Sequence, residues 1–222
     1  MALNPVLTEL TTAATDGLIA LVSLVCMAAL LRHRTEHRWR VTVWSWVFAL
    51  LAFASVLGAL AHGLDLAPPT RAWLWRPLYL SLGLVVALFV VGAVSDFLGE
   101  KTARKMLIPM LGLALAFFVV TQVGTGAFFV FVAYEGLAML AALGMYLSLA
   151  LRRTLAGAGT IAAGILLNIA AAAIQSVDSI AVTILVPFDH NGVFHLVQVA
   201  ALVTLTAGLL RSMARQRADR AR

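Results

Sequence analysis

Two histidines of this chain lie inside long apolar stretches, where an ionisable side chain is costly. His62 and His195 each stand near the end of such a stretch, and each has polar residues about one helical turn away. Ionisable groups within membrane-spanning segments are rare and usually serve binding, transport or catalysis. Neutral imidazole is the commonest metal ligand, and catalytic zinc is typically held by three protein ligands and one water. The two histidines therefore predict a shared functional site that binds zinc.

A third zinc ligand is expected near the start of the last apolar stretch. His190 is five residues before His195, so on one helix the two side chains would point in directions about 140° apart. His190 can therefore bind a metal shared with His195 only if the helix begins after it. A carboxylate is the other candidate for the third ligand. Asn191 shares the face of His195, but an amide is a weak zinc ligand. The expected metal ligands are His62, His195 and His190.

Acids, amides and a hydroxyl in other apolar stretches are expected at the same depth. Asp16 and Asp178 are candidates for orienting the metal ligands or carrying protons, and Ser55 shares a helical stripe with His62. The other interpretation of Ser55 and Gln198 is that they only hydrogen-bond neighbouring helices. We expect four further residues in the pocket, which are Glu135, Gln175, Asn191 and Gln198.

These residues must be positioned by seven stretches that are long and apolar enough to span a membrane. Of 222 residues, 62% are hydrophobic and only 12% are charged, whereas soluble domains carry about a quarter charged residues. This composition, with one cysteine, excludes soluble, disordered and disulfide-stapled proteins. The stretches do not alternate as barrel strands do, so an all-α integral membrane protein is predicted. One domain over residues 1–222 would contain spans at 12–31, 42–62, 75–94, 106–122, 127–150, 159–185 and 193–210.

Basic residues gather on one side of these predicted spans. Of the 16 lysines and arginines, only Arg71 and Arg76 fall on the other side. The positive-inside rule then places the N-terminus outside, the C-terminus in the cytoplasm and the polar pocket in the outer half of the bundle. The net charge of +6 indicates contact with anionic lipid headgroups at the cytoplasmic face, and nucleic acid is not an expected partner. Small-residue runs such as 170–173 allow close helix packing within one chain or between chains.

The run Phe188–Leu196 resembles the last-span signature of the CREST superfamily, which includes alkaline ceramidases and the progesterone and adiponectin receptors. His62 matches the histidine of the second span, and His195 matches the second histidine of the His-x-x-x-His motif that opens the seventh. The first histidine of that motif is Asn191 here, and Gly58 stands where the family has a serine. The resemblance implies a divergent, bacterial-type seven-span protein of the inner (plasma) membrane and a metal-dependent hydrolase of lipid amides.

Two functions are open for this set of residues. The first is a zinc-dependent hydrolase, in which metal-bound water attacks the carbonyl of a membrane lipid amide or ester. The second is a receptor or small-ligand-binding membrane protein that uses the same pocket without metal, which Asn191 favours. A haem or quinone site with His62 and His195 as axial ligands is a third interpretation. Retinal is not expected, because the lysines, Lys101 and Lys105, lie between spans.

Overall fold

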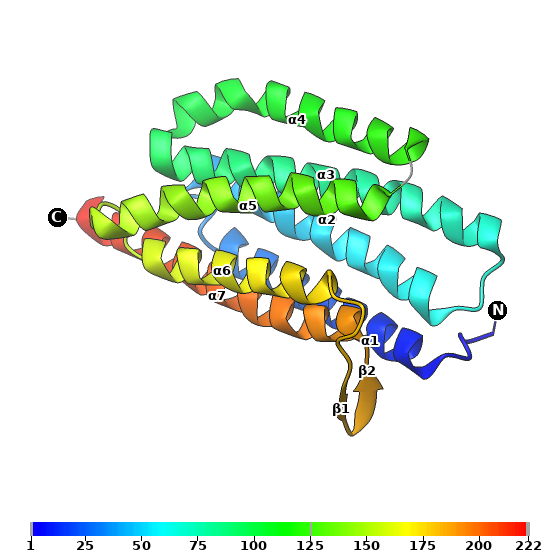
Figure 1. Ribbon diagram of the computed structural model, residues 1–222. Coiled ribbons are helices and arrows are strands. Elements are labelled where there is room, and N and C mark those ends of the chain that lie inside the picture. The colour runs from blue at the N-terminus through cyan, green and yellow to red at the C-terminus, as the bar shows by residue number, and fades with distance from the viewer. Residues whose placement is uncertain (1, 125, 221–222) are drawn as a thin grey trace.

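Seven long helices run back and forth along one direction (Figure 1). The computed structural model describes residues 2–124 and 126–220, with side-chain positions through Arg215. Each of the seven helices in these ranges is long and apolar enough to cross a membrane, which confirms the prediction of an all-α protein with seven membrane-length helices. The helices are α1 (Leu7–Leu31), α2 (Arg38–Gly63), α3 (Pro68–Leu98), α4 (Glu100–Val123), α5 (Ala127–Leu151), α6 (Ala158–Gln175) and α7 (His190–Arg220).

The two ends of the bundle differ in structure. Helices α1 and α7 begin, and α2 and α6 end, near a small hairpin of strands β1 (Val182–Ile184) and β2 (Val186–Phe188), and we call this the hairpin end (Figure 1). Helix α1 packs against α2 and α7, and α6 packs against α7. Helix α4 lies at the edge of the bundle against α3 (Figure 1). This arrangement brings the first and last helices of the chain side by side.

The sixth predicted span is corrected by the structure. The helix α6 ends at Gln175, ten residues before the predicted end at position 185, and an antiparallel hairpin follows in which Val182 lies opposite Phe188. Val182, Thr183 and Ile184 are β-branched residues, which favour strands. A short apolar run of this kind cannot be distinguished from a buried helix by hydropathy alone. Asp178 therefore lies in a turn and not within the sixth membrane-spanning helix.

A buried ion pair, which sequence reasoning did not identify, connects three helices at the end opposite the hairpin. Arg40 lies in the first turn of α2, where the sequence suggested a connection between spans, and its Nη2 lies 2.7 Å from Asp96 Oδ2 of α3. The Tyr146 hydroxyl of α5 donates a hydrogen bond of 2.7 Å to the same oxygen. The Arg40 and Asp96 side chains are only 9% and 4% exposed. This cluster ties α2, α3 and α5 together.

Helices α6 and α7 approach each other closely at two glycines. A Cβ atom on Gly164 would lie 2.8 Å from the backbone nitrogen of Leu205. A Cβ atom on Gly208 would lie 2.8 Å from the backbone nitrogen of Ile161 and 2.6 Å from its Cγ1. Small residues at helix–helix contacts let backbones pack in this way within membranes. The glycines at positions 164 and 208 therefore allow close packing of α6 and α7 within one chain.

Candidate functional site

A cavity of about 330 Å³ lies among six of the helices, α1, α2, α3, α5, α6 and α7. It follows α2 from His62 to Val47 and α7 from Asn191 to Leu205, which corresponds to roughly 20 Å of helix. Most of its lining is aliphatic or aromatic. Its acids, amides, imidazoles and aliphatic hydroxyl come from the half nearer the hairpin, and they are Asp16, Ser55, His62, Glu135, Asn168, Gln175, Asn191, His195 and Gln198.

His195 and Asp16 face each other across the contact between α7 and α1. His195 Nε2 lies 3.5 Å from Asp16 Oδ1, and both side chains are 9% exposed. His195 Nδ1 lies 2.9 Å from the hydroxyl oxygen of Thr15, and this hydroxyl also bonds to the carbonyl oxygen of Thr12 at 2.9 Å. A hydroxyl has one proton to donate, so a Thr15 that donates to Thr12 accepts from His195 Nδ1–H and leaves Nε2 toward the acid. The two groups therefore lie within ion-pair distance of each other in the interior of the bundle.

Gly58 makes room for the Asp16 carboxyl group. A Cβ atom on Gly58 would lie 2.7 Å from Asp16 Oδ2 and 2.9 Å from Oδ1. The acid therefore lies directly against the backbone of α2, one turn before His62. This contact leaves no room for a side chain at position 58 unless Asp16 moves.

The substitution Gly58→Ser is expected to displace Asp16 from His195 and to destabilise the protein by about 1–3 kcal/mol, because it overpacks a filled contact. The free energy of unfolding in detergent micelles is the measurement. Gly17→Ser is the matched control, since a Cβ atom on Gly17 would meet no atom within 4 Å. Equal stability of the two variants would show that Asp16 does not occupy this space.

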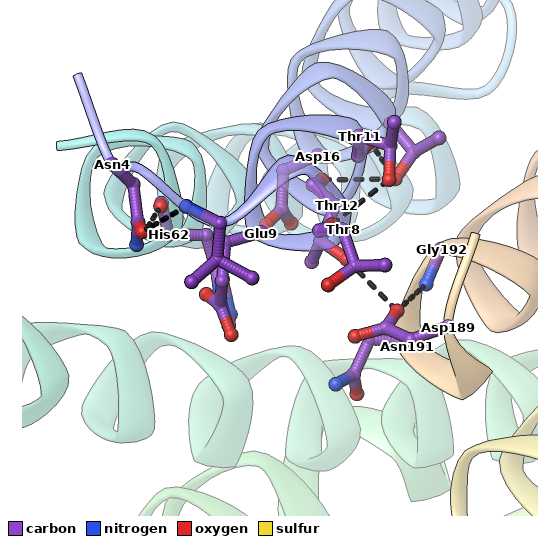
Figure 2. Close-up of polar contacts among 12 residues, drawn as sticks. Asn4, Thr8, Glu9, Thr11, Thr12, Asp16, His62, Asp189, Asn191 and Gly192 are labelled. Carbon is purple, nitrogen blue, oxygen red and sulfur yellow. Dashed lines mark hydrogen bonds and ion pairs between the residues drawn. The ribbon is translucent and has the colours of Figure 1, made fainter. Parts of the chain in front are cut away.

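His62 lines the cavity near the hairpin end. Its Nδ1 is 2.7 Å from Glu9 Oε2, and its ring packs edge-on against Trp75 with 5.7 Å between centroids. The N-terminal segment covers the end of α2, since the Asn4 side chain donates a hydrogen bond of 2.9 Å to the carbonyl oxygen of His62 (Figure 2). The Asp65 backbone N–H donates in turn to the carbonyl oxygen of Ala2.

Asp189 fixes the start of α7 beside α1. Figure 2 shows its carboxylate between the two helices, where Oδ1 accepts hydrogen bonds from the Thr12 hydroxyl at 3.0 Å and from the Gly192 N–H at 2.9 Å. An aspartate that accepts from the third residue of a helix is a typical N-cap. This cap determines which residues of α7 face the cavity, and therefore where His195 lies.

Glu135 and four amide side chains, three of which were predicted for the pocket, form three hydrogen bonds at the cavity wall. Asn168 Nδ2 donates a hydrogen bond of 2.9 Å to Glu135 Oε1, and Gln198 Nε2 lies 3.5 Å from Asn168 Oδ1. Closer to the hairpin end, Gln175 Nε2 donates to Asn191 Oδ1 at 3.3 Å. All five side chains line the cavity.

Two predicted site residues lie elsewhere. His190 and Asp178 do not line the cavity and instead face each other, with 3.7 Å between His190 Nε2 and Asp178 Oδ1. The Asp178 side chain is 97% exposed because it follows the end of α6. His190 is the first residue of α7, so it is on the helix with His195 and faces another direction. The expectation that both contribute to one pocket with His195 is corrected.

The donor groups do not fit the expected zinc site. Among the side chains of residues 2–124 and 126–215, no group of three or more His, Cys, Asp or Glu is arranged to hold a metal ion. Both ring nitrogens of His195 already face other groups, Thr15 and Asp16. His62 turns its Nδ1 toward Glu9. The arrangement offers proton transfer and hydrogen bonding rather than a three-ligand metal site.

Two residues of the site were missed by sequence reasoning. Thr15 is part of a threonine run in α1, and its position beside Asp16 was the signal available for it. Asn168 was not among the residues expected in the pocket, yet it lines the cavity and its side chain donates a hydrogen bond to Glu135. Trp75 and Tyr79 add aromatic surface to the same wall.

Comparison with known proteins identifies a family but no function. The model of the family DUF6962, described as a family of unknown function, matches residues 11–214. No curated protein and no solved structure matched the chain. The matched range contains α2 to α6 completely and every polar residue that lines the cavity.

Proposed function

We propose that this chain, which belongs to the DUF6962 family, holds an amphiphilic, lipid-like molecule in the cavity between its helices. One observation carries the proposal: the cavity has a polar half near the hairpin end and an apolar half of aliphatic and aromatic side chains beyond it. Ligand sites are typically concave and mostly apolar, with a few polar groups that fix orientation. A molecule with a polar head and a hydrocarbon tail matches both halves.

The distribution of charge supports entry of this molecule from the outer leaflet. Basic residues lie in the connection after α1, in the first turns of α4 and near the end of α7, while Arg71 and Arg76 lie near the hairpin end. Arg222 and the side chains of Arg217 and Arg220 are outside the described part of the chain. By the positive-inside rule the hairpin end faces outward, and we place the protein in a bacterial plasma membrane with its basic face on anionic lipid headgroups.

The same pocket supports a second function, hydrolysis of a lipid amide or ester. The observation that favours it is the 3.5 Å approach of His195 to Asp16, in a cavity that Ser55 also lines. His195 would take a proton from water as the oxygen attacks the carbonyl carbon. The proton would then pass to the leaving amine or alkoxide as its bond to carbon breaks. A zinc-dependent form of this reaction would require a third donor, which His190 could provide only if it left Asp178 and the first turn of α7 unwound.

Binding of a fluorescent monoacylglycerol to the full chain in non-ionic detergent tests the proposal. Ala54 lines the cavity and is 3% exposed, so Ala54→Phe fills the space that the tail needs. We expect this variant to lose at least about tenfold in affinity, or about 1.4 kcal/mol. The control is Ala116→Phe, which adds the same side chain on an exposed position of α4. Equal affinity of both variants would show that the probe binds outside the cavity.

Two further measurements on the same samples distinguish ligand binding alone from hydrolysis with or without zinc. Release of free fatty acid, lost in His195→Ala, would favour hydrolysis over binding alone. One zinc per chain in elemental analysis, also lost in His195→Ala, would favour the metal-dependent form. If neither fatty acid release nor bound zinc is observed, the protein binds its ligand without a reaction.

A further inference from the structure

Glu135 is a buried carboxyl group without a basic side chain beside it. It is 8% exposed, and its Oε1 accepts a hydrogen bond of 2.9 Å from Asn168. Among the described residues that line the cavity there is no lysine or arginine, and the other carboxyl group, Asp16, faces His195. A third acid, Glu9, does not line the cavity and faces His62. Of these three acids, Glu135 is the one whose hydrogen-bond partner is an amide.

The position of Glu135 marks the depth at which the polar part of the cavity ends. It is eight residues into α5 from the hairpin end, and Asn168 is seven residues from the end of α6, so both lie about 10–12 Å along their helices. The lining residues farthest beyond them, which include Val47, Phe48 and Leu205, are apolar. A polar group of the ligand can therefore reach Glu135, and only hydrocarbon fits beyond it.

The chemistry of this position favours a cation. An acid within a membrane protein often serves as the counter-ion of a ligand, and a charge-assisted hydrogen bond is about twice as strong as a neutral one. Phe131 lies one turn before Glu135 on the same face of α5 and lines the cavity with it. Aromatic faces next to a cation add a further attraction.

We infer that the ligand is a cationic amphiphile, an alkyl chain with an ammonium group that donates hydrogen bonds to Glu135. This inference rests on the proposed function and names the class of its ligand. Asn168 is a positioning residue, because its amide donates a hydrogen bond to the carboxyl group from α6, and Gln198 of α7 donates in turn to Asn168. The alkyl chain lies along the apolar half of the cavity.

Competition against the fluorescent monoacylglycerol tests this inference on the full chain. Hexadecylamine, hexadecanol and palmitate share a tail and differ in charge. We expect hexadecylamine to compete at least about tenfold better than hexadecanol, and palmitate to compete worst. In Glu135→Gln the preference for amine over alcohol is expected to fall to about one, because an amide keeps the acceptor for Asn168 but removes the charge. Glu100→Gln, the same change at an exposed acid, is the control that keeps the preference.

The outcomes separate this inference from the proposed function. If hexadecanol competes as well as hexadecylamine with the wild-type chain, the cavity binds amphiphiles but the ligand is not cationic. If the amine preference persists in Glu135→Gln, another group carries it and the assignment to Glu135 is wrong. If the monoacylglycerol does not bind in the cavity, the proposed function fails, and the inference fails with it.

Discussion

Asp96→Ala is expected to destabilise the bundle by about 3–5 kcal/mol, the typical cost of removing one partner of a buried ion pair. The substitution leaves the Arg40 guanidinium buried without its carboxylate and removes the acceptor of the Tyr146 hydroxyl. No other group compensates Arg40 for the lost carboxylate, since its Nε and Nη1 atoms are buried without a hydrogen-bond partner in the described structure. The effect is large because desolvation of the arginine is no longer compensated.

Unfolding of the purified chain in mixed detergent micelles, followed by circular dichroism, measures this effect. Asp178→Ala is the matched control, because that side chain is 97% exposed, and it should change stability by less than about 0.5 kcal/mol. The double variant Arg40→Met, Asp96→Leu should recover much of the loss, because it removes both charges and keeps the volume. A single variant Asp96→Ala as stable as Asp178→Ala would contradict the interpretation of Asp96 as the anchor of Arg40.

Gly208→Val is expected to cost at least about 2–3 kcal/mol of stability, at the upper part of the usual range for overpacking. The added side chain would meet the backbone of Ile161, and backbone cannot move aside as a flexible side chain can. The helices α6 and α7 would separate, and the cavity wall that includes Gly164 and Leu205 would separate with them.

The same unfolding assay measures this second effect. Gly112→Val on α4 is the control, since a Cβ atom there would meet nothing within 4 Å. If the two valine variants unfold together, the close approach of α6 and α7 does not contribute to stability. A loss of monoacylglycerol binding in Gly208→Val, with binding kept in Gly112→Val, would connect the packing to the site.

The sequence was sufficient to predict the seven helices and much of the cavity lining. Apolar length determines a membrane helix directly, and polar residues at helical spacing share a face. His62, His195 and Glu135 therefore lie at one cavity as expected. Asp178 was misplaced because the apolar content of 159–185 does not reveal that its last part forms a turn and a strand. His190 was misplaced because α7 begins at His190 itself and not after it.

The contacts within the site depend on which helices are neighbours, and the sequence does not give that. His195 meets Thr15 and Asp16 because α7 packs against α1, the helix farthest from it along the chain. Arg40 was counted with the solvated charges of a connection, since sequence position alone does not show that a helix begins before it. No role was predicted for Asp96, because the role of a single acid at the end of a span depends on which residues contact it.

The contact between α1 and α7 has a consequence for biosynthesis. Thr15 and His195 are 180 positions apart, so α1 leaves the ribosome long before the helix that contacts it. Until α7 is inserted, Asp16 has no imidazole beside it and is an expensive group to keep within lipid. Insertion of α7 places His195 beside Asp16 and removes that cost. The last helix to be translated therefore completes the site and stabilises the position of α1.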